Sequence, residues 1–190
     1  MDAKFSSIQR AVLDALRGME PRGVLTGGAA LSGYYFGHRA TRDLDFFFRG
    51  RVTLDEVPVL VETRLRAVGI HVHLAQSSPG FRRYDVKYGD ETLEVDLVAE
   101  PVEAVRDAVE VEPGIYVDTP YEILVNKLTA LLGRAAIRDL LDMKVLVDSG
   151  LDPHSALQDA ARKDWRLQSA DSGVGIGVAP GAKVSKRCGV

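Results

Sequence analysis

The sequence predicts an α+β fold in which a mixed sheet flanked by helices is followed by a small helical C-terminal region. Alternating and apolar runs typical of strands concentrate within residues 1–100. An amphipathic helical pattern precedes them, and helical patterns prevail after Pro101. The length of 190 residues fits one domain of ordinary size, or a compact domain with a small appended one.

The composition excludes several protein classes. Apolar residues make up 46% and charged residues 27%, the balance of a globular protein. Apolar runs fall short of the roughly 20 residues that cross a bilayer, and the N-terminus lacks the pattern of a signal peptide, so we expect a cytoplasmic location. Cys188, the only cysteine, excludes a disulfide framework. The net charge of −3 gives no overall electrostatic case for nucleic-acid binding.

Periodicity and turn residues define the elements of the first part. Expected in order are a helix over 3–17, a strand over 24–26, a helix over 29–36, a strand over 43–48, a helix over 53–67 and a strand over 70–74. Gly27-Gly28 turns the chain into the second helix. Thr53 is a possible N-cap of the third helix, and Gly69 stands close behind its end.

A β-hairpin is the clearest local prediction. Gly89-Asp90 is a two-residue turn signal between two alternating runs. In that register Tyr84 faces Val95 on a mostly apolar side, and Arg83 lies opposite Asp96 on a polar side. Asp96 is therefore expected on a sheet face rather than in a loop.

Helices are expected after Pro101. Thr119 and Glu122 have the spacing of a capping box at the start of a helix over 120–132. A second helix over 135–149 ends at Gly150, and a shorter one begins near residue 153. We therefore expect a core over 1–100, a helical region over 101–165 and a flexible, Gly-rich tail over 166–190.

Two aspartates one residue apart form the main candidate site. On a strand, Asp43 and Asp45 share one face about 7 Å apart, and two like charges at that distance raise each other's pKa unless a cation lies between them. Mg²⁺ suits such a pair, and Asp96 could complete a three-carboxylate cluster. A lone Asp-x-Asp is more often a solvated strand end. The order strand, Gly27-Gly28, helix and Asp-x-Asp strand favours a phosphate cradle beside a metal site.

Other charged residues remain ambiguous from the pattern alone. Lys127 lies on an apolar helical stripe, where it either extends to the surface or reaches a triphosphate. Arg138 and Asp142 have the spacing of a helix salt bridge. For Asp139 too, the pattern does not distinguish a structural role from a role in the site. Arg39 and Arg42 either pair with acids or neutralise charge near the aspartates. The strand residues His71 and His73 are expected to be surface or structural residues.

Three segments together resemble a known family. They are "GGAALSGYYFGHRATRDLDFF", "LEVDLV" and "NKLTALLGRAAIRDLLDMKVL". Their order, a Gly-Gly element, an arginine with Asp-x-Asp, and later a lysine with an R-D-x-x-D helix, resembles the AbiEii-type nucleotidyltransferases. These are the toxin half of type IV toxin–antitoxin systems. The resemblance spans about residues 22–150.

The resemblance implies a DNA polymerase-β-like nucleotidyltransferase core and a set of site residues. The implied catalytic residues are Asp43, Asp45, Asp96, Lys127, Asp139 and Asp142, of which Asp43, Asp45 and Asp96 hold Mg²⁺. The implied nucleotide-binding residues are Gly27, Gly28, Arg39, Arg42 and Lys127.

The expected reaction moves a nucleoside monophosphate from an NTP to an acceptor hydroxyl and releases pyrophosphate. The expected acceptor is the 3′ end of a tRNA, and the expected partner is a cognate antitoxin. Two alternatives stay open: nucleotidylation of a small molecule or a protein side chain, since fold does not determine substrate, and a catalytically silent NTP-binding module.

Overall fold

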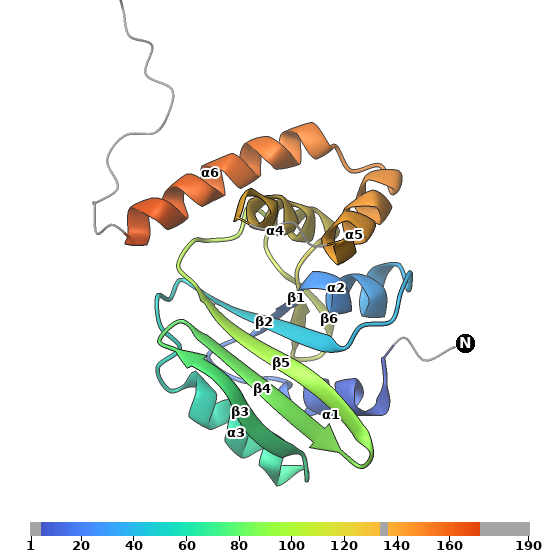
Figure 1. Cartoon of the computed structure of the whole chain (residues 1–190), viewed down its shortest axis with the longest axis vertical. Coiled ribbons are helices and arrows are strands. Elements are labelled where there is room, and N and C mark those ends of the chain that lie inside the picture. The colour runs from blue at the N-terminus through green and yellow to red at the C-terminus, as the bar shows by residue number, and fades with distance from the viewer. Residues whose placement is uncertain (1–4, 134–136, 172–190) are drawn as a thin grey trace, which may run out of the picture.

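One sheet of seven strands organises the molecule (Figure 1). The structure is a computed structural model that describes residues 5–133 and 137–171. The strands are β1 (Val24–Thr26), β2 (Asp43–Arg49), β3 (His71–Ser78), β4 (Phe81–Tyr88), β5 (Glu91–Glu100), β6 (Val109–Glu112) and β7 (Ile115–Val117). Their order across the sheet is β3-β4-β5-β2-β1-β7-β6. The β2–β5 and β1–β7 pairs are parallel and the others antiparallel, so the expected mixed sheet is confirmed.

Helices lie on one face of the sheet and at one end of it. They are α1 (Ser7–Leu16), α2 (Gly27–Ala30), the π-helical turn η1 (Leu31–Tyr35), α3 (Val57–Ala67), α4 (Pro120–Gly133), α5 (Ile137–Asp148) and α6 (Pro153–Asp171). In Figure 1, α1 and α3 lie behind the sheet, whereas α4, α5 and α6 form a layer beyond one end of β2 and β5. Among the helices of the described residues, none covers the opposite face of β3, β4 and β5.

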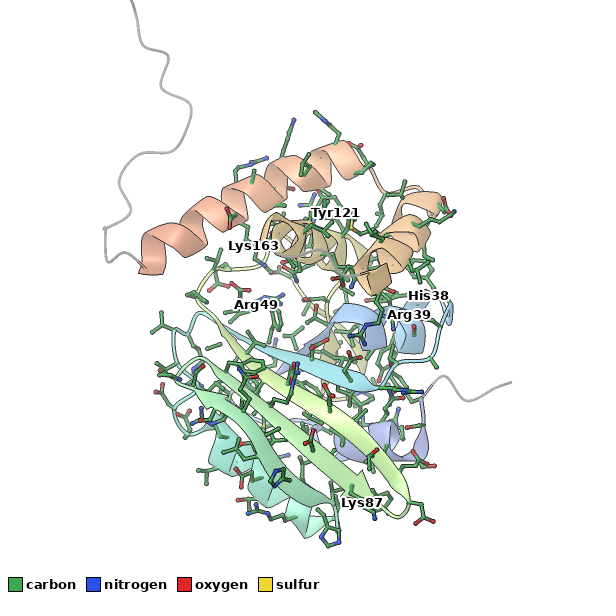
Figure 2. All side chains as sticks on the ribbon, in the orientation of Figure 1. His38, Arg39, Arg49, Lys87, Tyr121 and Lys163 are labelled. Atoms are coloured by element: carbon green, nitrogen blue, oxygen red, sulfur yellow. The ribbon has the colours of Figure 1, made fainter. Side chains whose placement is uncertain are left out.

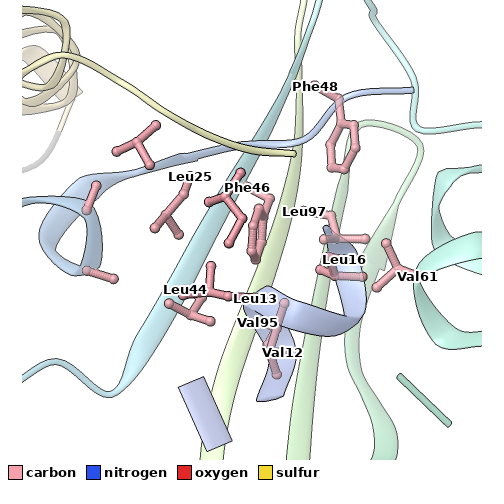
Figure 3. Packing of buried hydrophobic residues seen from close by; sticks show 14 of the residues in the cluster. Val12, Leu13, Leu16, Leu25, Leu44, Phe46, Phe48, Val61, Val95 and Leu97 are labelled. Atoms are coloured by element: carbon pink, nitrogen blue, oxygen red, sulfur yellow. The ribbon is translucent and has the colours of Figure 1, made fainter. Parts of the chain in front are cut away.

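The core lies between α1, α3 and the covered sheet face. Strand β2 alternates as expected: Leu44, Phe46 and Phe48 are buried, whereas Asp43 and Asp45 are partly exposed on the other face. Figure 3 shows apolar side chains of α1 packed against those of β2 and β5. Burial of one face therefore fixes the register that places the aspartates on the open face.

The expected β4–β5 hairpin is confirmed in its register. Tyr84 pairs with Val95 and Arg83 with Asp96, across a turn in which Gly89 has φ +59°. The positive φ is the conformation that such a two-residue turn requires of glycine.

Several expected boundaries are wrong. The second helix begins at Gly27 rather than residue 29, and β3 continues to Ser78. Thr53 is not a cap, because its hydroxyl donates to the Asp55 carboxylate and α3 starts only at Val57. The last helix continues to Asp171, so residues 166–171 belong to it, and residues 172–190 lie outside the described part.

The expectation of helices alone after Pro101 is also wrong. Strands β6 and β7 form a hairpin, and β7 extends the sheet by pairing with β1 through Leu25 and Val117. Both strands are too short to display periodicity, and β7 owes its place in the sheet to pairing with the distant strand β1. The capping box is half formed: Glu122 N–H donates to Thr119 Oγ1 at 3.2 Å, but the Glu122 carboxylate accepts from other groups.

Candidate active site

A cavity of about 410 Å³ opens where the carboxylate face of the sheet meets the C-terminal helices. Its lining comes from strands β1 to β5, the start of α2, and helices α4 and α5. The lining residues are Thr26, Gly27, Asp45, Phe47, Gln76, Phe81, Arg83, Asp96, Val98, Ile123, Asn126, Lys127, Ala130 and Asp139. A second hollow of about 580 Å³ beside His71 and Lys87 holds none of the candidate catalytic residues.

The cavity brings together half of the residues singled out from the sequence. Those that line it are Gly27, Asp45, Asp96, Lys127 and Asp139. Those outside its lining are Gly28, Arg39, Arg42, Asp43 and Asp142. Arg42 is exposed, and only its carbonyl oxygen is engaged, by Glu94 N–H at 3.1 Å, within the described residues.

Asp45 and Asp96 lie directly opposite each other on the parallel strands β2 and β5. Burial, followed by the negative charges of Asp43 and Asp96, raises the pKa of the Asp45 carboxyl to about 7. Asp96 is neutralised by Arg83, whose Nε and Nη2 donate to its two carboxylate oxygens at 2.8 and 2.6 Å. Asp45 therefore carries most of the uncompensated charge of this pair.

Asp43 lies at the edge of the site. Arg138 Nη1 stands 3.6 Å from its Oδ2, across the gap between β2 and α5. The possible helix salt bridge between Arg138 and Asp142 is not formed, because the Asp142 carboxylate is held by residues from other elements. Arg138 is largely exposed, so this contact leaves Asp43 only weakly compensated.

Both glycines of the Gly-Gly element are required by close neighbours. Gly27 has φ +69°, and a Cβ placed on it would stand 2.5 Å from Asp45 Oδ2. A Cβ on Gly28 would stand 2.1 Å from Nη2 of Arg39. The first glycine thus lets the backbone approach the carboxylate, and the second lets an arginine pass beneath the turn.

Lys127 projects into the cavity from a buried ion cluster. Its Nζ lies 2.8 Å from Asp139 Oδ1 and 2.8 Å from Asp142 Oδ2. Asp142 also accepts from Arg39 Nε at 2.7 Å and contacts His38 Nε2 at 2.7 Å. Burial alone would raise the pKa of Asp142, but hydrogen bonds from Arg39, Lys127 and His38 outweigh it and lower the pKa well below its ordinary value.

The carboxylates fit a divalent cation in their chemistry. Among residues 5–133 and 137–171, no three His, Cys, Asp or Glu side chains form a ready-made metal cluster. Asp43 and Asp45 nevertheless present hard oxygen ligands with an excess of negative charge, and Lys127 and Arg83 act on Asp45 only through charge at a distance. Both oxygens of Asp96 are occupied by Arg83, so ligation by Asp96 requires that contact to rearrange.

A second buried ion network lies behind the cavity. Lys163 of α6 donates to Glu122 Oε1 at 3.0 Å and to Asn126 Oδ1 at 2.6 Å. Arg49 Nη2 donates to Asp118 Oδ2 at 2.9 Å, which also accepts from Asn126 Nδ2 at 3.3 Å. Figure 2 places Lys163 and Arg49 where α6 approaches the end of β2. This network joins the helical layer to the sheet.

Sequence reasoning missed several functional candidates. Gln76 and Phe81 line the cavity but lie in no motif, and Asn126 lines it beside Lys127 without having been singled out. His38 was not singled out, although it lies within the segment that resembles the family. The ion pair between Arg83 and Asp96 could have been predicted from the sequence, because the expected hairpin register places the two residues opposite each other.

Comparison with known proteins identifies the family. A family model described as nucleotidyl transferase AbiEii toxin of type IV toxin–antitoxin systems matches residues 11–173. The chain belongs to this family. No curated protein sequence matches it.

Solved structures share the fold of this AbiEii chain. The nucleotidyltransferase toxin MenT4 from Mycobacterium tuberculosis H37Rv has a TM-score of 0.67 and 18% identity, over 87% of this chain and 65% of MenT4. JHP933 from Helicobacter pylori has a TM-score of 0.56 and 18% identity, over 88% of this chain and 93% of its own. The antibiotic-resistance factor ANT(2″)-Ia has a TM-score of 0.54 and 12% identity, over 92% of this chain and 96% of its own.

The AbiEii chain is therefore a nucleotidyltransferase with a polymerase-β-like fold, as the sequence resemblance implied. Within the described residues, no helix has the length and apolar character needed to span a bilayer.

Proposed function

We propose that this nucleotidyltransferase moves a nucleoside monophosphate from an NTP to the 3′-terminal hydroxyl of an RNA, with a tRNA as the principal acceptor, and that it requires Mg²⁺. In the cell it acts as a toxin held in check by a cognate antitoxin. The observation that carries the proposal is the convergence of Asp45, Asp96, Gly27 and Lys127, from four elements, on one cavity.

The triphosphate is assigned to the Gly27 and Lys127 end of the cavity. Gly27 lets backbone N–H groups approach a phosphate at the start of a helix. Lys127 adds a positive charge that Asp139 and Asp142 hold in place. Together they orient the α-phosphate toward the carboxylates, which is the main contribution a protein makes to this kind of transfer.

Asp43 and Asp45 are assigned as the ligands of Mg²⁺, and Asp96 as a third ligand after Arg83 moves aside. The bound ion supplies neutralisation of the developing charge on the phosphates. Asp96 lies on the side of Asp45 away from Gly27, since the strand order is β1-β2-β5. An acceptor hydroxyl that approaches from that side meets a carboxylate able to take its proton.

The test is incubation of the purified protein with each α-³²P-labelled NTP, Mg²⁺ and three acceptor pools: total tRNA, an aminoglycoside mixture and casein. We expect label on tRNA from one or more NTPs, and none with Asp45→Ala or Lys127→Ala. Label only on aminoglycosides or casein would overturn the RNA acceptor and keep the enzyme class. Absence of transfer together with unchanged melting temperature in NTP and Mg²⁺ would overturn the whole proposal.

A further inference from the structure

An apolar strip crosses the open sheet face beside the carboxylates. Phe47 on β2 pairs with Val98 on β5, and Val98 pairs with Phe81 on β4, so the three side chains form one row. All three line the cavity, and all three are only partly buried. The row of Asp45, Asp96 and Arg83 runs parallel to it, one strand repeat away.

Two partly exposed phenylalanines line the same cavity as the charged residues Asp45, Asp96 and Lys127. Apolar surface exposed beside a charged site is typical of a ligand contact. The chemistry fits an unpaired nucleobase. Bases stack on aromatic rings and on arginine planes, and the guanidinium carbon of Arg83 lies 5.8 Å from the ring centroid of Phe81.

Charge limits where the rest of such a ligand can lie. On the other side of the carboxylate row, Asp43 pairs with Glu94 across β2 and β5, and Glu94 pairs with Asp85 across β5 and β4. Arg138 and Arg83 each lie 3.6 Å from one of these carboxylates, so three carboxylates face two arginines and the flank is acidic on balance. A phosphodiester is repelled there. Beyond Phe81, the edge strand β3 presents the exposed, uncharged residues Gln76 and Ser78. The β3 edge is therefore the side over which a nucleic-acid strand can leave the cavity at low electrostatic cost.

The strip could bind either the base of the NTP or a base of the acceptor, and its position in the cavity distinguishes the two. The Gly27 and Lys127 end is assigned to the triphosphate, whereas Phe81 lies on β4, beyond both carboxylates. A base on Phe81 therefore lies on the acceptor side of the reacting groups. We infer that Phe47, Val98 and Phe81 form a stacking shelf for the unpaired 3′-terminal base of a single-stranded RNA acceptor, an inference that rests on the proposed RNA substrate.

The experiment measures RNA binding without catalysis. Fluorescence anisotropy follows a 5′-fluorescein single-stranded RNA ten-mer binding to the full chain, in parallel with the same RNA carrying an abasic 3′-terminal nucleotide. A fluorescent NTP analogue measures nucleotide affinity for the same variants. Phe81→Ala removes the ring, Phe81→Tyr keeps it, and Tyr88→Ala, an exposed aromatic at the far end of β4, is the matched control.

We expect Phe81→Ala to weaken RNA binding about tenfold, the scale of one base–aromatic stack, with NTP affinity unchanged. Phe81→Tyr and Tyr88→Ala bind RNA like the parent chain. The abasic RNA binds the parent about tenfold more weakly, and Phe81→Ala adds no further loss. RNA binding with this pattern but without nucleotidyl transfer would refute the proposed reaction and leave the shelf intact.

Three results would overturn the shelf. They are equal RNA affinity of Phe81→Ala and Tyr88→Ala, loss of NTP affinity instead of RNA affinity in Phe81→Ala, and absence of RNA binding by the parent chain. The second result would assign the strip to the base of the NTP.

Discussion

The ammonium group of Lys127 lies 2.8 Å from Oδ2 of Asp142, a carboxylate with no exposed surface. Arg39 and His38 contact the same carboxylate, so one buried anion holds three cationic or basic groups from α4 and the loop before β2. Lys127 alone of these four lines the cavity. In the proposed function, Asp142 positions Lys127, whereas Asp139 contacts Lys127 from the cavity wall.

Neutralising Asp142 should cost far more stability than neutralising Asp139. Asp142→Asn leaves buried cations without their anion, which costs about 3 kcal/mol or more and lowers the melting temperature by roughly 10 °C. Asp139 is partly exposed, so Asp139→Asn should change the melting temperature little. Differential scanning fluorimetry measures both. Equal shifts would contradict the role assigned to the buried cluster.

Replacement of Gly27 by alanine should damage the site beyond its backbone strain. Gly27 and Gly69 both have positive φ, at +69° and +81°, so alanine strains each by about 1 kcal/mol. Only at Gly27 does the added Cβ meet Asp45, whereas nothing lies within 4 Å at Gly69. We expect similar melting temperatures for the two variants and loss of NTP-dependent stabilisation in Gly27→Ala alone. Retained stabilisation in Gly27→Ala would show that the close approach is dispensable.

Asp45 should reduce stability at neutral and alkaline pH. Its pKa is raised from 3.8 to about 7, so its folded form keeps a proton that the unfolded chain has lost between those values. The resulting stabilisation is complete below pH 3.8 and is lost as pH rises through about 7. Without metal, Asp45→Asn should therefore melt a few degrees above the parent at pH 8, with the gap closing on acidification. If the parent chain melted above Asp45→Asn at pH 8 in EDTA, this prediction would be contradicted.

Elements with a local signal were predictable, and those that depend on distant partners were not. The alternation of β2 and the Gly89-Asp90 turn are local, and both fixed the faces on which Asp45 and Asp96 lie. Strands β6 and β7 were not predicted because both are short, and β7 is held in the sheet by pairing with the distant strand β1. The long composite of glycines, aspartates and Lys127 was specific enough to imply the family, which the family model confirms.

Partners of individual side chains were beyond the sequence. A lysine on an apolar stripe admits two readings, and only the approach of α5 shows that Lys127 meets Asp139 and Asp142. Arg138 has the spacing of a helix pair with Asp142 but turns to Asp43. Such choices depend on the packing of elements that lie far apart in the chain.

Lys163 should be essential for the stability of the helical layer. Lys163→Met leaves Glu122 buried without its ammonium partner, which costs about 3 kcal/mol or more. Lys144→Met is the matched control, because Lys144 is exposed and pairs with Asp148 one turn away, a contact worth less than about 1 kcal/mol. Urea denaturation compares them. A Lys163→Met midpoint equal to that of Lys144→Met would refute the structural role of the network.

The central claim is that the α-phosphorus of an NTP moves to an acceptor at the site of Asp45 and Lys127. The most direct measurement supplies the same NTP labelled with ³²P either at the α or at the γ position, with Mg²⁺ and total tRNA, to the parent chain and to Asp45→Asn. The expected result is label on tRNA from the α position only, and none with Asp45→Asn. Label from the γ position, or undiminished transfer by Asp45→Asn, would contradict the account.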